Sequence, residues 1–574
     1  MDVSRLALYT RTLSRLKARQ VAYLVLRRLW PVAKRPLAKT PSGSIRGGVS
    51  MQAPLVATMP MDREHEFRFV NASKTFSHGK VDWSSADMPK LWRYNLHYFD
   101  YLLNSRRPVA EISSLITDWI QSNPTGRGDG WEPYPVSLRI VNWIKLFLRP
   151  DFRQHVHAGW IDSLYQQVRW LEENIEYHIL ANHYLKNGKA LVFAGIFFEG
   201  AVADRWLRKG AKILVEEAHE QILPDGGHYE RSPMYHSIVI EDYLDALNLM
   251  TGQPGALPAA EVVLLKGKVT KALNFLHDIC LPDGCIPLFN DSAFGIAPSF
   301  VALAEYAHRL IGYAPPSRGQ GLHVSSYDSS GYFVIRNGDD MLVVDCGDVG
   351  PDYQPGHAHC DTLSFVLASE GRTSIVDSGV YDYEDSDMRR YVRGTRAHNT
   401  AMVDDCEQSE MWGAFRVARR ARPIHASIER FGESKALFSG SHDGFGRLPG
   451  QPVHARTIEY EADGIWTVVD TFTGGGRHQV ESFVHLHPDV NAHRVGSTIS
   501  LALPPARVAI EIEVLNAPEI ALEKGWYCPE FGIRRQNTVI RLSSSGPLPQ
   551  SLGYRIVKRW ANAPAMPPAS DERR

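Results

Sequence analysis

The sequence predicts an α+β multidomain protein in which an array of helical hairpins precedes a large antiparallel β-sandwich. Apolar residues recur at helical spacing through the first half, and β-rich runs separated by tight turns begin near residue 320. Hydrophobic residues make up 44% and charged residues 22% of the 574 residues, which is a globular composition. At about 150 residues per domain, this length allows about four domain-sized units or two large ones.

Residues 1–70 are predicted to form a basic N-terminal extension and linker. The apolar stretches of the first 30 residues are interrupted by Arg, Lys and Gln, no small-residue cleavage site follows, and residues 36–49 are rich in Pro, Gly and Ser. We therefore expect no signal peptide. No uninterrupted apolar run reaches the length of about 18 residues that a transmembrane helix needs. These features favour a cytoplasmic location, or one peripheral to a membrane, over classical secretion.

Residues 71–318 are predicted to form a helical domain of the α/α or toroid kind. The residues of one apolar stripe follow steps of three and four: Ile161, Leu164, Val168, Leu171 and Ile175. Segments 182–197 and 239–250 are also typical of helices. The sequence Leu-Pro-Asp-Gly occurs at 223–226 and again at 281–284, each time after an apolar helical run. This repetition indicates successive helical hairpins with similar turns.

Residues 319–562 are predicted to form the sandwich. Two hairpins are expected, at 331–344 around Asn337-Gly338 and at 362–376 around Glu370-Gly371. Further strands are expected at 401–403, 458–462, 466–473, 480–486 and 508–514. Many short strands over roughly 240 residues favour a large sandwich over a small barrel. Residues 563–574, rich in Pro, Ala and charge, are predicted to be a disordered tail.

The densest group of chemically active residues begins at 356–361, with the sequence Gly-His-Ala-His-Cys-Asp. In a strand, His357 and His359 would point the same way, so they either share a metal ion or divide between metal and substrate. Together, His359, Asp377 and His398 offer nitrogen and carboxylate donors that suit zinc. The alternative is that they are separate surface or hydrogen-bonded groups, since the chain contains 23 histidines.

A run of arginines precedes His398. It comprises Arg389, Arg390, Arg393 and Arg396, and further arginines follow at positions 416, 419, 420 and 422. In a chain of net charge -1, which gives no reason to expect a nucleic-acid partner, this run is a local electropositive site able to bind carboxylates or sulfates. An equally weighted alternative is a solvated face paired with nearby acids, namely Asp382, Glu384, Asp385 and Asp387.

The helical half carries its own polar group. Asn182 and His183 open a predicted helix, and residues 226–236 crowd titratable side chains after a turn. Because loops between hairpins tend to lie at one end of a helical array, these segments are expected around one mouth. The alternative for Tyr235 and His236 is a packed ring with a satisfied polar tip.

Five motifs, in this order, resemble the heparinase II/III family of polysaccharide lyases over roughly residues 90–540: NHYLKNGKAL, DGGHYERSPMYH, GHAHCDTLSF, VDSGVYDY and RGTRAHNT. The resemblance implies an incomplete (α/α) toroid followed by a large antiparallel β-sandwich. It also implies a carbon-oxygen lyase that cleaves an anionic, uronic-acid-containing polysaccharide by β-elimination.

The resemblance also implies residue roles. Asn182 would neutralise the uronate carboxylate, Tyr235 would act as base, acid or both at C5 and O4, and His357 would be an opposite-face base or a carboxylate contact. Nearby cations would favour the Tyr235 phenolate. Further substrate contacts are expected from His183, His236, Arg393 and Arg396. The zinc ligands would be His359, Asp377 and His398, and the ion would hold the loop that presents His357.

Two other functions are compatible with the sequence. A glycoside hydrolase would use paired carboxylates, for which Asp225 and Glu230 are the close candidates, although helix capping and ion pairing are alternative roles for them. A non-catalytic glycan-binding or assembly protein could keep the same fold and zinc. The basic extension in place of a signal peptide is typical of relatives that accompany exopolysaccharide or surface-glycan assembly. Alginate, glucuronan, heparan sulfate, hyaluronan and chondroitin are all candidate polymers.

Overall fold

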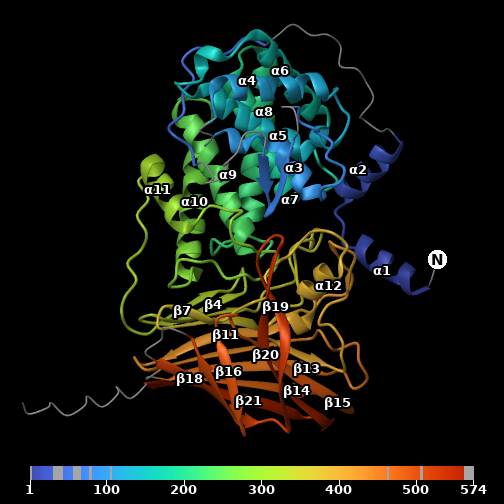
Figure 1. Cartoon of the computed structure of the whole chain (residues 1–574), viewed down its shortest axis with the longest axis vertical. Coiled ribbons are helices and arrows are strands. Elements are labelled where there is room, and N and C mark those ends of the chain that lie inside the picture. Colours follow the sequence, from blue (N-terminus) through green and yellow to red (C-terminus); the bar gives the residue numbers. More distant parts are fainter. Residues whose placement is uncertain are drawn as a thin grey trace, which may run out of the picture.

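The protein is represented by a computed structural model that describes residues 3–29, 43–55, 66–76, 80–103, 107–461, 464–503 and 508–560. Helices form one half of the molecule and stacked sheets form the other (Figure 1). This order confirms the predicted fold class, a helical toroid followed by a β-sandwich. The predicted tail at 563–574 and the linker residues 36–42 lie outside the described residues. Among the described helices, none combines the length and hydropathy that crossing a membrane requires.

The toroid is built from helices that pack side by side. Its helices are α3 (Lys90–Tyr98), α4 (Val109–Ser122), α5 (Pro133–Leu148), α6 (Ala158–Glu173), α7 (Ala181–Phe197), α8 (Ala201–Gln221), α9 (Pro233–Thr251), α10 (Ala259–Ile279) and α11 (Phe300–Ile311). The helices predicted at 161–175, 182–197 and 239–250 are confirmed by α6, α7 and α9. Helix α9 begins earlier than predicted because the Ser232 side chain accepts a hydrogen bond from the Tyr235 backbone N–H, and Pro233 occupies the first turn.

The two Leu-Pro-Asp-Gly turns follow α8 and α10, as predicted. Gly226 has a φ of 96°, and a Cβ there would lie 2.4 Å from the Lys271 carbonyl oxygen, so this turn requires glycine. The Asp225 carboxylate accepts hydrogen bonds from the Ser330 backbone N–H and hydroxyl, both at 2.8 Å. The first turn therefore ties the toroid to the sandwich.

The sandwich contains three main antiparallel sheets. The first consists of β3 (His323–Tyr327), β4 (Tyr332–Asn337), β5 (Asp340–Asp345), β6 (Ser364–Ser369) and β7 (Arg372–Ile375). The largest has the order β11 (Pro423–Phe431), β12 (Lys435–His442), β13 (Val453–Glu461), β14 (Ile465–Thr473), β21 (Gln550–Trp560), β18 (Val508–Asn516), β17 (Thr498–Ala502) and β16 (Asn491–Val495). The last contains β19 (Glu519–Glu530), β20 (Ile533–Pro547), β15 (Arg477–His485) and β8 (Ala401–Val403). The predicted hairpins and strands lie in these sheets, apart from residue 462, which falls outside the described part.

The first sheet is buried on both faces. On β4, Tyr332 and Val334 belong to the core of the toroid, whereas Phe333 and Ile335 belong to the core of the sandwich. Strands β5 and β6 divide their side chains in the same way. Because successive side chains of a strand point to opposite faces, a run that is apolar at every position suits this intermediate layer. The sheet thereby fixes the toroid against the sandwich.

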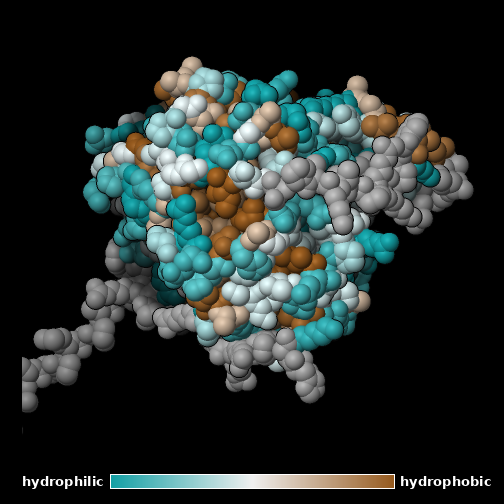
Figure 2. Space-filling model, turned by 90° about the horizontal axis from the view of Figure 1, so that it is seen from above, coloured by the Kyte–Doolittle hydropathy of each residue, from teal (hydrophilic) through white to brown (hydrophobic). Residues whose placement is uncertain are grey.

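The N-terminal segment lies along the side of both domains. Helices α1 (Val3–Leu13) and α2 (Ala18–Leu29) are found beside the junction (Figure 1). A hairpin of β1 (Glu66–Phe69) and β2 (Ala72–Thr75) follows, and Phe67 and Phe69 are buried in the toroid core. The predicted boundary at residue 70 falls inside this hairpin. Seen from the helical end, the surface is largely hydrophilic, with hydrophobic residues gathered near its centre (Figure 2).

Buried neutral histidines should make the fold sensitive to acid. Burial lowers the pKa of His97 to about 3 and the pKa values of His236 and His485 to about 4. The unfolded chain, whose histidines titrate near pH 6.5, then binds more protons, so stability falls as the pH falls through this range. We expect the free energy of unfolding, measured by urea denaturation, to decrease between about pH 6.5 and 4, by up to about 3 kcal/mol per histidine.

Replacing His236 should reduce this dependence. His236→Gln removes one titrating group, whereas His425→Gln removes an exposed histidine on β11 and serves as the control. Only the first variant should flatten the pH dependence of unfolding. Identical slopes for both variants would contradict the assignment of acid sensitivity to His236.

Candidate active site

The three predicted catalytic residues meet at the junction of the two domains. Asn182 comes from α7, Tyr235 from α9 and His357 from the loop between β5 and β6. The rings of Tyr235 and His357 are stacked with their centroids 4.0 Å apart. The Glu230 carboxylate lies between Asn182 and His357. One of its oxygens is 3.5 Å from Asn182 Nδ2, and the other is 3.7 Å from His357 Nε2. The three side chains are therefore linked in one cluster through the stacked rings and Glu230.

The backbone before Asn182 is strained. Leu180 has a φ of 64° and Ala181 a φ of 54°, values that residues with a Cβ rarely adopt. Such conformations persist only where the surrounding structure enforces them, and they are concentrated at functional sites. Asn182 follows directly, in the first turn of α7, and is buried.

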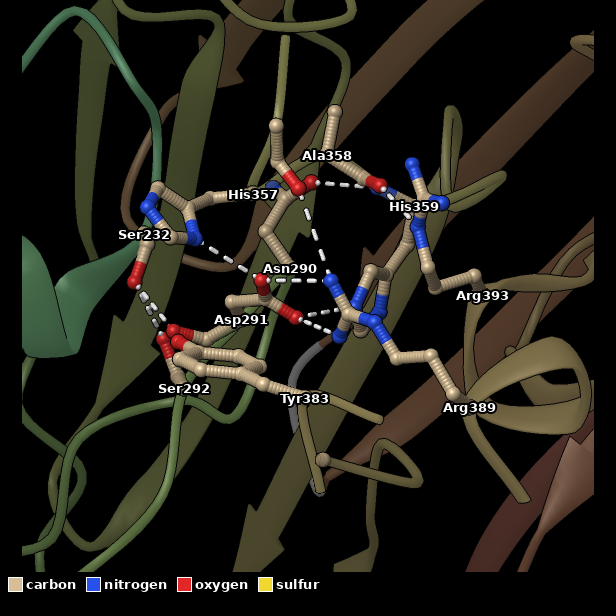
Figure 3. A network of polar contacts seen from close by, with 12 residues as sticks. Ser232, Asn290, Asp291, Ser292, His357, Ala358, His359, Tyr383, Arg389 and Arg393 are labelled. Atoms are coloured by element: carbon tan, nitrogen blue, oxygen red, sulfur yellow. Dashed lines mark hydrogen bonds and ion pairs between the residues drawn. The ribbon is translucent and has the colours of Figure 1, made fainter. Parts of the chain in front are cut away.

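A single buried carboxylate, that of Asp291, organises the sandwich side of the site (Figure 3). It interacts with His357 Nδ1 at 2.8 Å, with His359 Nε2 at 2.9 Å and with both terminal nitrogens of Arg389, of which Nη2 lies at 2.8 Å. Burial alone would raise the pKa of Asp291, but Arg389 and the two histidines hold it well below its usual value. Asp291 is therefore a fixed negative charge between the two histidines.

The hydroxyl of Tyr235 lies 3.0 Å from that of Tyr383. Burial, the neighbouring Tyr383 hydroxyl and the Asp291 charge raise the pKa of Tyr235 well above its usual value. The expectation that nearby cations would favour a phenolate is therefore wrong. The only arginine of the predicted run that makes a contact near Tyr235, Arg389, is already paired with Asp291. These surroundings favour the protonated phenol of Tyr235 in the free protein.

A group that could hold a metal ion lies behind His357. Ligand atoms of His359, Asp361 and His398 lie within 4.8 Å of one another, and all three residues are buried. His359 Nδ1 and His398 Nε2 have no hydrogen-bond partner among the described residues. Two histidine nitrogens and a carboxylate oxygen form a donor set that suits a divalent transition metal.

Asp377, predicted to complete this group, lies outside it in the structure. Its Oδ2 atom lies 2.9 Å from His398 Nδ1, so Asp377 engages the ring nitrogen opposite the free Nε2. A carboxylate in this position orients a ligating histidine instead of binding the ion. Asp361 takes the place predicted for Asp377.

Of the predicted substrate contacts on the helical side, His183 lies at the site and His236 does not. His183 is partly exposed next to Asn182; its Nδ1 lies 3.0 Å from the Glu176 carboxylate, and its ring lies 4.4 Å from that of Tyr134. His236 is buried, with Nε2 2.9 Å from the Ala272 carbonyl oxygen. One step along a helix turns a side chain by about 100°. His236 therefore faces α10, and its prediction as a substrate contact is wrong.

The two arginines predicted as substrate contacts are engaged by other parts of the protein. Arg393 is buried and donates hydrogen bonds to the carbonyl oxygens of Ala358 at 3.2 Å and Gly413 at 2.9 Å, so it supports the loop between the two histidines. Arg396 is ion-paired with Glu481 at 3.1 Å. For Arg390 the solvated alternative holds, since it pairs with Asp385 and Asp387. The run is thus divided among four separate environments.

Several residues of the site were not singled out from the sequence. Tyr383 and Asp361 lie inside quoted motifs, so the motifs carried a signal that residue type alone did not separate. Asp291 lies in a loop whose sequence gives no pattern. The hydrolase alternative is not supported, because Asp225 is bound to Ser330 whereas Glu230 is buried between Asn182 and His357.

Comparisons with known proteins agree with this architecture. The model named "Heparinase II/III N-terminus" matches residues 32–306, and "Heparinase II/III-like, C-terminal" matches residues 319–561. A heparin-sulfate lyase of Pedobacter heparinus is 26% identical over 321 residues, covering 50% of this chain and 47% of the relative. A heparin-sulfate lyase of Bacteroides thetaiotaomicron is 26% identical over 381 residues, covering 57% and 54%. The chain thus spans about half the length of these curated relatives.

A solved structure supports the fold. The crystal structure of heparinase III superposes with a TM-score of 0.68 at 19% identity, covering 85% of this chain and 80% of the other. At this level of identity the likeness concerns the fold alone.

Metal binding can be measured directly. We expect elemental analysis of the purified protein to find about one equivalent of a divalent transition metal, and His359→Ala or His398→Ala to lose it, because each removes one of few donors. His442→Ala, which changes a buried histidine elsewhere in the sandwich, is the control and should retain the ion. Equal metal content in all variants would contradict this site.

Proposed function

The chain belongs to the heparinase II/III family, and we propose that it cleaves a uronic-acid-containing polysaccharide by β-elimination. The observation that carries this proposal is the convergence of Asn182, Tyr235 and His357, from both domains, in one cluster. The heparin-sulfate lyases among the relatives support the same substrate class.

The first requirement of the reaction is to neutralise the uronate carboxylate. Removing the C5 proton places more negative charge beside this group, so donors must be fixed in advance to stabilise that charge. The Asn182 amide can supply one. Burial raises the pKa of Glu230, and its Oε2 lacks a hydrogen-bond partner in the described structure. A protonated Glu230 would be a second donor in the same cluster.

The second requirement is a base and an acid. Asp291 keeps a proton on His357 Nδ1, which leaves Nε2 free to accept the proton from C5. The neutral phenol of Tyr235 would donate its proton to O4 as the C4–O4 bond breaks and the C4=C5 double bond forms. A proton from solvent would then return to the Tyr235 phenolate through Tyr383, whose hydroxyl lies 3.0 Å away. The protonated His357 then loses its proton to solvent.

We also propose that the metal is zinc, held by His359, Asp361 and His398. The donor set suits zinc, and Asp291 and Asp377 bond the second ring nitrogens of the two histidines. When bound, the ion would neutralise the buried Asp361 and fix the loop. Because Asp291 contacts both His357 and His359, fixing His359 would also hold His357 in position.

Elimination is distinguishable from hydrolysis by its product. Incubation with a panel of alginate, glucuronan, heparan sulfate, hyaluronan and chondroitin should give an unsaturated uronate, seen as rising ultraviolet absorbance, with at least one polymer. Tyr235→Phe removes the proton donor and should lower kcat by about a hundredfold or more. Tyr165→Phe, on α6, is the matched control and should leave kcat unchanged.

Two results would oppose this function. New reducing ends without the absorbance would indicate hydrolysis. Unchanged turnover by Tyr235→Phe would remove Tyr235 from the mechanism.

A further inference from the structure

The inner stripe of helix α2 is polar and contacts the protein. Gln20, Tyr23 and Arg27 follow helical spacing on this stripe, and Gln20 is the buried residue of the helix. The ring of Tyr23 lies 4.6 Å from that of Tyr177. An N-terminal helix attached by polar groups at defined points has a more specific role than covering an apolar core.

These contacts converge on the segment that leads to Asn182. Arg27 Nη2 donates hydrogen bonds to the carbonyl oxygens of Asn174 at 2.8 Å and Ile175 at 3.2 Å. The side-chain amide of Gln20 donates to the Ile179 carbonyl oxygen at 3.3 Å. Ile179 immediately precedes the two residues with positive φ, Leu180 and Ala181. Helix α2 thus bonds the backbone on the N-terminal side of the strained turn.

The same amide reaches the other domain. Gln20 Nε2 also lies 3.4 Å from the carbonyl oxygen of Tyr353, four residues before His357. The Gln20 side chain is held in this position because its Oε1 accepts a hydrogen bond from the Lys17 backbone N–H at 2.9 Å. The Lys17 ammonium lies 3.9 Å from the centre of the Tyr353 ring. One buried amide is therefore bonded to both active-site segments.

We propose that Gln20 is a positioning residue, and that α2 is a clamp that holds the Asn182 segment and the His357 loop in register across the domain junction. The strained turn at Leu180 and Ala181 needs an external constraint, and the Gln20 amide supplies one at the adjacent peptide. The catalytic part of this inference rests on the proposed function, whereas the structural part does not.

Hydrogen exchange tests the clamp without substrate. Gln20→Met keeps the size of the side chain and removes both hydrogen bonds. Mass spectrometry should show faster amide exchange, by about tenfold or more, in peptides covering residues 176–186 and 350–358, because opening of these loops loses its constraint. Arg28→Ala, on the exposed side of the same helix, is the control and should exchange like the wild type. Unchanged exchange in both peptides of Gln20→Met would overturn the proposal.

A kinetic measurement tests the catalytic part. With a polymer that the wild type cleaves, Gln20→Met should lower kcat by about tenfold with a smaller change in KM, because misplaced catalytic groups act on the chemical step. A lower kcat with unchanged melting temperature supports positioning. Unchanged kcat overturns it. If no polymer is cleaved, the proposed function fails, whereas exchange still decides the role of Gln20.

A second, independent observation concerns the downstream arginines. A groove of about 610 Å3 lies between the end of α1 and the sandwich, and its lining includes Arg11, Arg15, Arg419, Arg420, Arg422 and Arg447. Asp443 is the acidic residue in this lining. Two further carboxylates, those of Glu410 and Asp352, form ion pairs with Arg11, Arg15 and Arg420. The groove keeps an excess of positive charge after these pairs.

Two of the arginines remain accessible. Arg422 is exposed and its side chain forms no ion pair within the described part of the chain, and Arg419 is 3.6 Å from Glu410, a long contact for an ion pair. Guanidinium groups bind carboxylates and sulfates through paired hydrogen bonds. Segments about 400 positions apart thus converge on one cationic groove.

We infer that this groove, whose lining does not include Asn182, Tyr235 or His357, binds the anionic polysaccharide outside the reacting site. The choice of ligand rests on the proposed function, since a uronate polymer carries a regular series of anionic groups. Binding there would add affinity without touching the bond that is cleaved.

Affinity for polyanions tests the groove. Binding of the full chain to immobilised heparin and hyaluronan should weaken by about tenfold or more in the double variant Arg419→Ala/Arg422→Ala, because two accessible guanidinium groups are lost. Arg477→Ala/Arg555→Ala removes the same charge from exposed positions on β15 and β21. A larger loss on heparin identifies sulfates as the ligands, and equal losses identify carboxylates.

Two outcomes would overturn the groove. Equal weakening in the control pair would show that net charge alone causes the loss of affinity. Unchanged affinity of the groove variant would show that the groove does not bind the polymer. If groove-dependent binding occurs without any elimination product, the binding role of the groove is supported and the proposed lyase activity is contradicted.

Discussion

The buried Asp291 carboxylate is the contact on which the site depends. It belongs to the segment that precedes α11, yet its partners His357, His359 and Arg389 all belong to the sandwich. Without Asp291, each of these partners would lose a buried hydrogen bond or ion pair, which is costly in a low-dielectric interior. The toroid and the sandwich are therefore held together at the place where the proposed chemistry requires both. The proposed catalytic imidazole of His357 and the candidate metal-ligand imidazole of His359 share one fixed negative charge as a result.

This arrangement needs a rigid frame. The frame is the first sheet, which packs its alternate side chains into two different cores, so the toroid cannot slide on the sandwich without exposing apolar surface. Asp225 adds a polar tie through Ser330. Helix α2 lies across the same junction and bonds both segments through Gln20. The packed first sheet, the Asp225–Ser330 hydrogen bonds and helix α2 thus all stabilise the junction between the two domains.

The sequence was sufficient to predict the structural features that depend on periodicity. Helices α6, α7 and α9, the glycine turns and the strands of the sandwich follow from local spacing. It was also sufficient for the meeting of Asn182, Tyr235 and His357, through family motifs. It was insufficient where neighbours distant in the chain decide the outcome. Asp361 lies with the unpaired imidazole nitrogens of the candidate metal group, whereas Asp377 bonds the opposite nitrogen of His398. Arg393 and Arg396 are engaged by partners that no local pattern reveals.

The charge state of Tyr235 follows from the same long-range effects. Nearby cations would lower the pKa of the Tyr235 phenol, but Arg389 is neutralised by Asp291, so burial dominates and the protonated phenol is favoured. A protonated phenol can donate to a leaving oxygen but cannot remove a carbon-bound proton. In the proposed reaction the base is therefore a different group, His357, which stacks on Tyr235 and whose tautomer Asp291 fixes. The assignment of acid and base therefore derives from one buried ion pair.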